Sequence, residues 1–165
     1  MIVVSDTSPL NYLILVNAID VVPRVFTSVV TPSAVLAELE DTGAAPEVRR
    51  WAASPPAWLR VQEPKAIEDS LRLGKGETAA ISLAVELRTR EKDVRVLIDE
   101  RDGRAAASRL GLGLVGTLAV LGQAGALGLL NLQEAIDRLR QTSFHARPQL
   151  YEEVLRLDRK RRKGS

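Results

Sequence analysis

A short apolar run near the start of the chain ends in a carboxylate. Residues 2–5 read Ile-Val-Val-Ser, Asp6 follows directly, and Thr7-Ser8-Pro9 opens a predicted helix over residues 8–15. Such a run is typical of a strand buried on both faces of a parallel sheet, where a carboxylate without a partner is costly. Ligands of open α/β sheets bind beyond the carboxyl ends of the strands. The question that follows is whether other carboxylates converge on Asp6.

Strands alternate with helices along the rest of the chain. Further strands are predicted at residues 29–30, 58–61, 94–98 and 112–115, and the prolines around 58–61 favour an edge position. Helices are predicted at residues 17–26 (broken), 32–41, 46–53, 64–73, 75–88, 101–110, 117–126, 132–141 and 148–157. This order predicts parallel βαβ units in a three-layer α/β/α sandwich, which we expect to form one domain over residues 1–158.

The composition of the chain excludes several classes of catalytic and metal-binding site. The chain has 165 residues and no cysteine, which excludes disulfides, thiolate metal sites and a cysteine nucleophile. A single histidine, His145, excludes any mechanism that needs two imidazoles. No signal peptide or membrane span is evident, so we expect a cytoplasmic protein.

The charge is uneven. The net charge is +2, but residues 156–163 carry +5 locally, which leaves the remainder at −3. This pattern predicts a basic, disordered tail over residues 159–165, with non-specific attraction to nucleic acid as the alternative role.

Further acids stand where strands end or helices begin. Asp99 follows the strand 94–98 as Asp6 follows the first strand, although it would serve equally to begin a loop or cap the next helix. Glu77 lies at the centre of the apolar face of the helix 75–88, which predicts an inward carboxylate. Glu38 and Glu40 flank the apolar face of their helix equally, so periodicity does not choose between them.

Carboxylates clustered without histidine or cysteine select hard cations such as Mg²⁺ or Mn²⁺. A cation held by carboxylates in an open cleft activates water and neutralises the charge of a phosphodiester. The acids therefore favour metal-dependent hydrolysis of phosphodiester bonds.

Several motifs resemble those of a known family. Residues 4–10 (Val-Ser-Asp-Thr-Ser-Pro-Leu) resemble the opening of PIN-domain ribonucleases. Residues 73–77 and 97–101, with Phe144 and residues 148–151, resemble the branch of VapC-type toxins of toxin–antitoxin systems. The resemblance covers residues 2–157 and implies a parallel sheet of about five strands, an Mg²⁺- or Mn²⁺-dependent endoribonuclease, an antitoxin partner and a homodimer.

The resemblance also assigns catalytic residues, which are Asp6, Glu38 in preference to Glu40, Glu77 and Asp99. Of these, Asp6, Glu77 and Asp99 are the expected metal ligands. The third position is commonly aspartate in the wider family and is glutamate here. Asp99, Glu100 and Asp102 crowd the fourth position, and we prefer Asp99 because it directly follows the strand.

Four neighbouring residues are candidates for contacts with phosphate or water, namely Thr7, Ser8, Arg101 and Thr117. Helix capping is the competing interpretation for the three hydroxyl residues, and it is favoured for Ser8 and Thr117. The competing function is a non-catalytic α/β binding module with a vestigial acidic pocket.

Overall fold

A five-stranded parallel sheet forms the centre of the computed structural model, which describes residues 1–164. The strand order is β3-β2-β1-β4-β5, and every neighbouring pair is parallel. The strands are β1 (Ile2–Ser5), β2 (Ser28–Thr31), β3 (Leu59–Val61), β4 (Val94–Leu97) and β5 (Gly113–Val115). The predicted parallel sheet is confirmed, β3 lies at an edge, and β1 occupies the middle.

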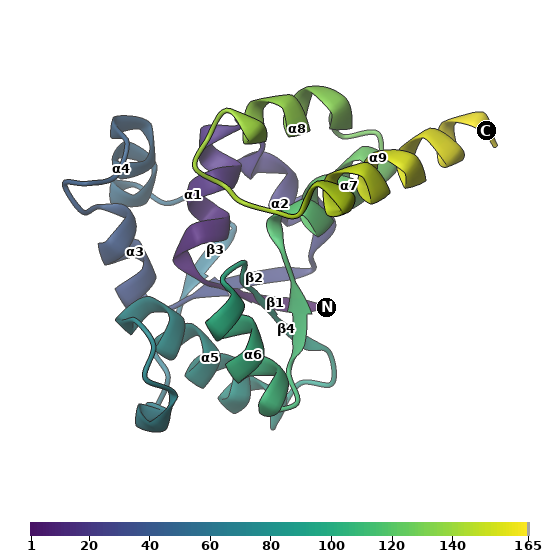
Figure 1. Ribbon diagram of the computed structural model, residues 1–165. Coiled ribbons are helices and arrows are strands. Elements are labelled where there is room, and N and C mark those ends of the chain that lie inside the picture. The colour runs from purple at the N-terminus through teal and green to yellow at the C-terminus, as the bar shows by residue number, and fades with distance from the viewer. Residues whose placement is uncertain (165) are drawn as a thin grey trace.

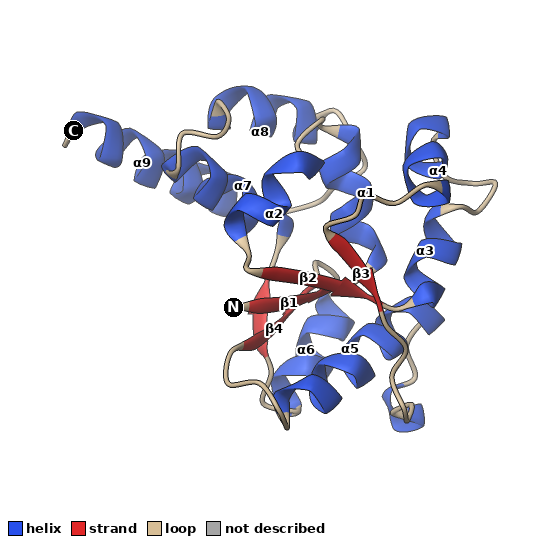
Figure 2. Ribbon diagram, turned by 180° about the vertical axis from the view of Figure 1, so that it is seen from behind, coloured by secondary structure: helices blue, strands red, loops and turns tan. Residues whose placement is uncertain are grey.

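Helices cover both faces of the sheet, as the three-layer prediction requires (Figures 1 and 2). Val3 and Val4 of β1 are fully buried in two different hydrophobic clusters, because successive side chains of a strand point to opposite faces. The cluster around Val4 is closed by α5 and α6, and the cluster around Val3 by the remaining long helices. The helices are α1 (Thr7–Leu15), α2 (Val22–Val25), α3 (Ser33–Leu39), α4 (Pro46–Ala53), α5 (Lys75–Arg88), α6 (Arg101–Arg109), α7 (Thr117–Ala126), α8 (Leu132–Arg140) and α9 (Pro148–Lys163), with 3₁₀ turns at Ile19–Val21 and Asp69–Leu71.

The predicted helix over residues 64–73 is wrong. Only Asp69–Leu71 forms a single 3₁₀ turn there, and Arg72 adopts a left-handed conformation with φ of 53°. The backbone N–H groups of Lys65 and Glu68 donate instead to side chains of α5, Glu86 and Ser82, at 2.7 and 2.9 Å. Because these donors are satisfied by the neighbouring helix, the segment does not need helical hydrogen bonds of its own.

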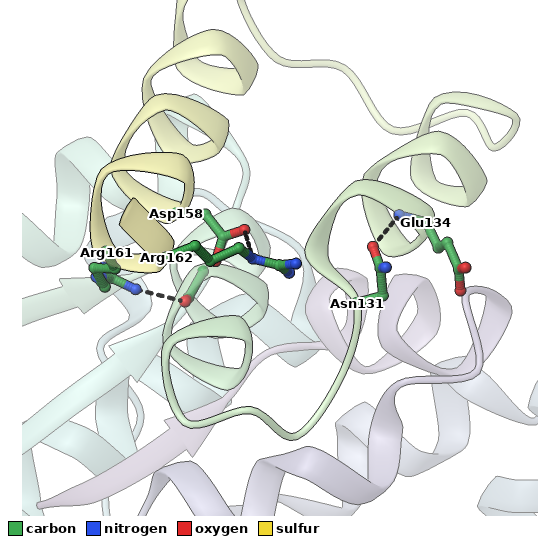
Figure 3. Close-up of polar contacts among 6 residues, drawn as sticks. Asn131, Glu134, Asp158, Arg161 and Arg162 are labelled. Atoms are coloured by element: carbon green, nitrogen blue, oxygen red, sulfur yellow. Dashed lines mark hydrogen bonds and ion pairs between the residues drawn. The ribbon is translucent and has the colours of Figure 1, made fainter. Parts of the chain in front are cut away.

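The predicted disordered tail is also wrong over its described part, because α9 continues through residues 159–163. Tyr151 and Leu155 bury the first half of α9, and Asp158, only 7% exposed, forms an ion pair with Arg162 at 3.0 Å (Figure 3). Arg161 also donates to the carbonyl of Gly122 at 3.4 Å. These contacts extend the helix past the boundary predicted at residue 158, and Ser165 lies outside the described residues.

Figure 1 shows the end of α9 reaching beyond the other helices. Among residues 1–164, no helix combines the length and the apolar character that crossing a membrane requires.

Candidate active site

Asp6 directly follows the central strand β1 and occupies the N-cap position of α1, so it lies at the middle of the carboxyl edge of the sheet. Its backbone N–H donates to the carbonyl of Leu97 on β4 at 2.9 Å, which fixes its position against the neighbouring strand. The residue is 2% exposed, its side chain makes no capping hydrogen bond, and Oδ1 is buried without a partner. An Asp at this position ordinarily caps the helix, so the free oxygen is an exception that calls for a ligand.

The pKa of Asp6 is raised to about 7. Burial is the largest cause, since it disfavours the charged form, and the backbone N–H of Thr7 opposes it. The carboxylates of Glu77, Glu38 and Glu100 raise the pKa further. Three other acids therefore lie within electrostatic reach of Asp6.

Glu77 lies in the first turn of α5 and points inward, as its place on the apolar face predicts. Its Oε1 atom is buried and has no hydrogen-bond partner. Burial raises the pKa of Glu77, and Glu100, Glu38 and Asp102 raise it further, against the backbone N–H of Gly74. The carboxylate has room only because residue 103 is glycine, since a Cβ there would overlap Glu77 Oε1 and come within 2.5 Å of Ile98 Cδ1.

Glu38 and Glu40 occupy different surroundings. Glu38 accepts hydrogen bonds from the hydroxyl of Thr7 and from the backbone N–H of Gly76, the latter at 2.8 Å. A Cβ at position 76 would come within 2.9 Å of both Glu38 oxygens, so this glycine admits the carboxylate. Glu40 is exposed at the end of α3 and lines a separate cavity beside α4. The structure therefore brings Glu38, and not Glu40, to the acids.

Asp99 is held by one residue. Thr117, the first residue of α7, donates its backbone N–H to Oδ1 at 2.8 Å and its hydroxyl to Oδ2 at 2.6 Å. Burial raises the pKa of Asp99, while both Thr117 hydrogen bonds and the charge of Arg104 lower it. Both carboxylate oxygens of Asp99 therefore already have a donor, unlike those of Asp6 and Glu77.

Glu100 is the acid that the sequence could not separate from its neighbours. It occupies the N-cap of α6 and accepts a hydrogen bond from the hydroxyl of Ser8 at 3.4 Å. It raises the pKa of Asp6, Glu77 and Asp99, whereas Asp102 acts on Glu77. Of the three crowded acids, Glu100 is thus the one whose charge raises the pKa of both Asp6 and Glu77, which the preference for Asp99 did not anticipate.

The three hydroxyl residues donate hydrogen bonds to the acids and do not occupy the N-cap positions of helices. Asp6 and Gly116 hold the N-cap positions of α1 and α7, so the capping roles favoured for Ser8 and Thr117 are wrong. Thr7, Ser8 and Thr117 donate to Glu38, Glu100 and Asp99 respectively. Arg101 is exposed and lines a cavity beside the acids.

The sequence interpretation missed the two glycines that make room for the acids, Gly76 and Gly103. Gly103 carried a readable signal, because a glycine inside a helical pattern costs about 1 kcal/mol relative to alanine and so marks a packing requirement.

The comparison with protein families decides the class. The family model DUF3368, described as a PIN domain, matches residues 2–160. The chain belongs to the PIN-domain family. No curated protein and no solved structure matched the chain. PIN domains are generally nucleases, hydrolases that act on nucleic acids, and they typically use divalent metals.

The acids of this PIN domain fit a divalent cation in one particular way. Among residues 1–164, no group of three or more His, Asp or Glu side chains stands together as a site that could hold a metal ion. Two buried carboxylate oxygens, Asp6 Oδ1 and Glu77 Oε1, nevertheless lack any donor. Mg²⁺ commonly takes one or two carboxylates and keeps several waters, so two open oxygens at one edge of the sheet match its needs.

Proposed function

We propose that this PIN domain is an endoribonuclease that hydrolyses phosphodiester bonds of RNA and depends on Mg²⁺ or Mn²⁺. One observation carries the proposal, which is that two acids from different elements, Asp6 and Glu77, each leave a buried oxygen without a partner. Because an unpartnered buried carboxylate is costly, its occurrence twice at the ligand-binding edge of the sheet indicates a cation in the functional state.

The residues take distinct parts in this proposal. Asp6 and Glu77 hold the cation, which when bound lowers the pKa of water and neutralises charge on the phosphodiester. Glu38 is fixed by Thr7 and Gly76 and is exposed to solvent, so we assign it to orient the attacking water and accept its proton. Asp99, fixed by Thr117, and Glu100, bound by Ser8, complete the acidic edge. Arg101 is the candidate contact to phosphate.

The biological role that we propose is that of the toxin of a toxin–antitoxin pair, acting in the cytoplasm as a homodimer. The resemblance of residues 73–77 and 97–101 to VapC-type toxins supports this role. The antitoxin would cover the acidic edge and so suppress cleavage.

The first experiment incubates purified protein, freed of any partner, with single-stranded RNA in the presence of Mg²⁺ or Mn²⁺. We expect cleavage that EDTA abolishes and that Asp6→Asn removes, while the control Glu40→Gln keeps it. Expression should arrest growth, and Asp6→Asn should relieve the arrest.

The competing function, a non-catalytic binding module, makes the opposite predictions. The ribonuclease proposal fails if the protein cleaves no RNA with either cation and if Asp6→Asn still arrests growth. Mass spectrometry of the protein purified from its native cells tests the antitoxin, because a small partner should copurify and inhibit cleavage.

A further inference from the structure

A cavity of about 580 Å³ opens directly beside the acids. Three segments line it, namely Ser8 and Tyr12 of α1, residues 99–102 at the start of α6, and residues 143–145 between α8 and α9. Glu100 belongs both to this cavity and to the group of acids that act on Asp6 and Glu77. A ligand in this cavity would therefore lie next to a phosphate bound at the acidic edge.

Aromatic contacts hold one wall of the cavity in place. The rings of Tyr12 and Phe144 pack edge to face with centroids 5.1 Å apart, and Phe144 packs in the same way on Tyr151 at 6.4 Å. The hydroxyl groups of Tyr12 and Ser143 are hydrogen-bonded at 3.2 Å. The loop at 143–145 is thus fastened to both α1 and α9, and the cavity is formed before any ligand arrives.

The lining matches the chemistry of a nucleobase. Its volume lies within the range of small-molecule sites, roughly 300–1,000 Å³. Bases of single-stranded RNA are recognised by contact with aromatic side chains and by hydrogen bonds to their polar edges. Tyr12 and Phe144 supply aromatic surface, while Asp102, Ser143 and His145 supply polar groups to the lining.

The polar groups also indicate which bases fit. Glu100 and Asp102 are carboxylates, which only accept hydrogen bonds when ionised. Carboxylates pair with exocyclic amino groups such as cytosine N4, and guanine and adenine carry amino groups as well. Uracil has no amino group, and its only donor on this edge, N3–H, lies between two carbonyl oxygens that would face the carboxylates.

We propose that this cavity binds the nucleobase next to the scissile phosphate and selects amino-bearing bases over uracil, with Asp102 and His145 determining specificity. The proposal rests on the proposed ribonuclease function for the position of that phosphate. Binding of a nucleotide in the cavity does not itself require cleavage, so the two proposals can fail separately.

The single histidine makes binding directly observable. His145 gives the only imidazole signals in the proton NMR spectrum of the full chain, so they need no assignment by mutation. We expect AMP, GMP and CMP, added with EDTA present, to shift these signals saturably, and UMP to bind at least about fivefold more weakly, the lower limit for one good base contact. Inorganic phosphate alone should leave them in place. The proposal is overturned if no nucleotide shifts them or if phosphate shifts them equally.

Cleavage mapping supplies the second measurement. The wild-type protein and Ser143→Ala, His145→Ala and Asp102→Asn variants are incubated with random single-stranded RNA and a divalent cation, and the cut ends are sequenced. We expect uridine to be depleted at one position flanking the cut, and each variant to weaken that depletion while still cutting. Ser108→Ala, an exposed change on α6 outside the cavity, is the matched control.

The outcomes separate the two proposals. Cleavage without any flanking preference, together with unmoved His145 signals, overturns the nucleobase site and leaves the nuclease. Absence of cleavage with saturable shifts of His145 overturns the nuclease and leaves the nucleobase site. A preference that survives unchanged in all three variants shows that other residues read the base, and it also overturns the proposal.

Discussion

Four of the acids at the edge of the sheet fall into two pairs of opposite character. Glu38 and Asp99 each accept one threonine hydroxyl and one backbone N–H, from Thr7 and Gly76 for Glu38 and from Thr117 for Asp99. Asp6 and Glu77 each leave one buried oxygen with no partner. We call these the fastened pair and the open pair.

The difference shows that residue type alone does not define a ligand. A carboxylate that already accepts two hydrogen bonds is stabilised little by a cation, and its two donors fix its position. A buried oxygen without a donor gains the whole interaction when a cation arrives, because it has no hydrogen bond to lose. The open pair is therefore suited to hold a cation, and the fastened pair to orient what surrounds it.

The largest effect should come from neutralising the open pair. Asp6→Asn or Glu77→Gln should lower the rate of RNA cleavage by about 10³-fold or more, as removal of central catalytic groups commonly does. Neither change should lower the thermal unfolding temperature in EDTA, since each removes a buried charge. A Glu40→Gln variant with an unchanged rate is the matched control. Equal rates for Asp6→Asn and the wild type would remove the distinction between the pairs.

The next effect is on stability as a function of pH in the absence of divalent cations. The pKa of Asp6 is 3.8 in the unfolded reference and about 7 in the folded protein, so between these values the folded state binds more protons. The free energy of unfolding should therefore fall as pH rises from 4 to 7, by as much as roughly 4 kcal/mol, and then level off. Urea unfolding across this range measures the fall.

Two comparisons sharpen that measurement. Asp6→Asn should reduce the pH dependence and leave the smaller parts that Glu77 and Asp99 contribute through their own raised pKa values. Saturating Mg²⁺ or Mn²⁺ should raise the unfolding free energy of the wild type at pH 8 but not that of the variant. A wild-type stability that is constant from pH 4 to 7 would contradict the open state of Asp6.

A smaller effect should follow from removing the space that the open pair needs. Gly103→Ala should displace the Glu77 carboxylate and lower the cleavage rate by about 10–100-fold, because misplacement of a catalytic group by about 1 Å is costly. Gly74→Ala is the matched control on the neighbouring segment, since a Cβ there meets nothing within 4 Å. If both variants retain full activity, the position of Glu77 does not matter to the reaction.

The smallest effect should come from loosening the fastened pair. Thr117→Val removes the hydroxyl donor to Asp99 Oδ2 but keeps the backbone N–H to Oδ1, so we expect a loss of about 1–3 kcal/mol in stability and a rate reduction of no more than about 10-fold. Thr117→Ser should restore both. A loss as large as that of Asp6→Asn would place Asp99 with the open pair.

The sequence was sufficient wherever a pattern acts within one element. The short apolar run at residues 2–5 predicted β1, and the position of Glu77 on an apolar helix face correctly predicted its inward direction. Contacts between distant segments could not be predicted from such patterns. The hydroxyl groups of Thr7 and Thr117 donate hydrogen bonds to Glu38 and Asp99, which belong to other elements. The angular position of a residue on its own helix does not reveal such contacts, and so periodicity could not separate Glu38 from Glu40.

The same limit explains the wrong predictions. Residues 64–73 have helical composition, but the side chains of Glu86 and Ser82 bind their backbone in another conformation. The basic end of the chain looked solvated and mobile because its anchor, the burial of Asp158 against other helices, is not visible in the charge pattern.

The order of the strands has a consequence for how the site comes into being. Strand β1 lies between β2 and β4, so its pairing on the second side requires Val4 to meet Val96, which is far away in the sequence. Closure of so long a loop carries an entropic cost that slows folding. The acidic edge is therefore complete only when segments as far apart in the chain as Thr7 and Thr117 have come together, so its formation depends on the slowest contacts of the sheet.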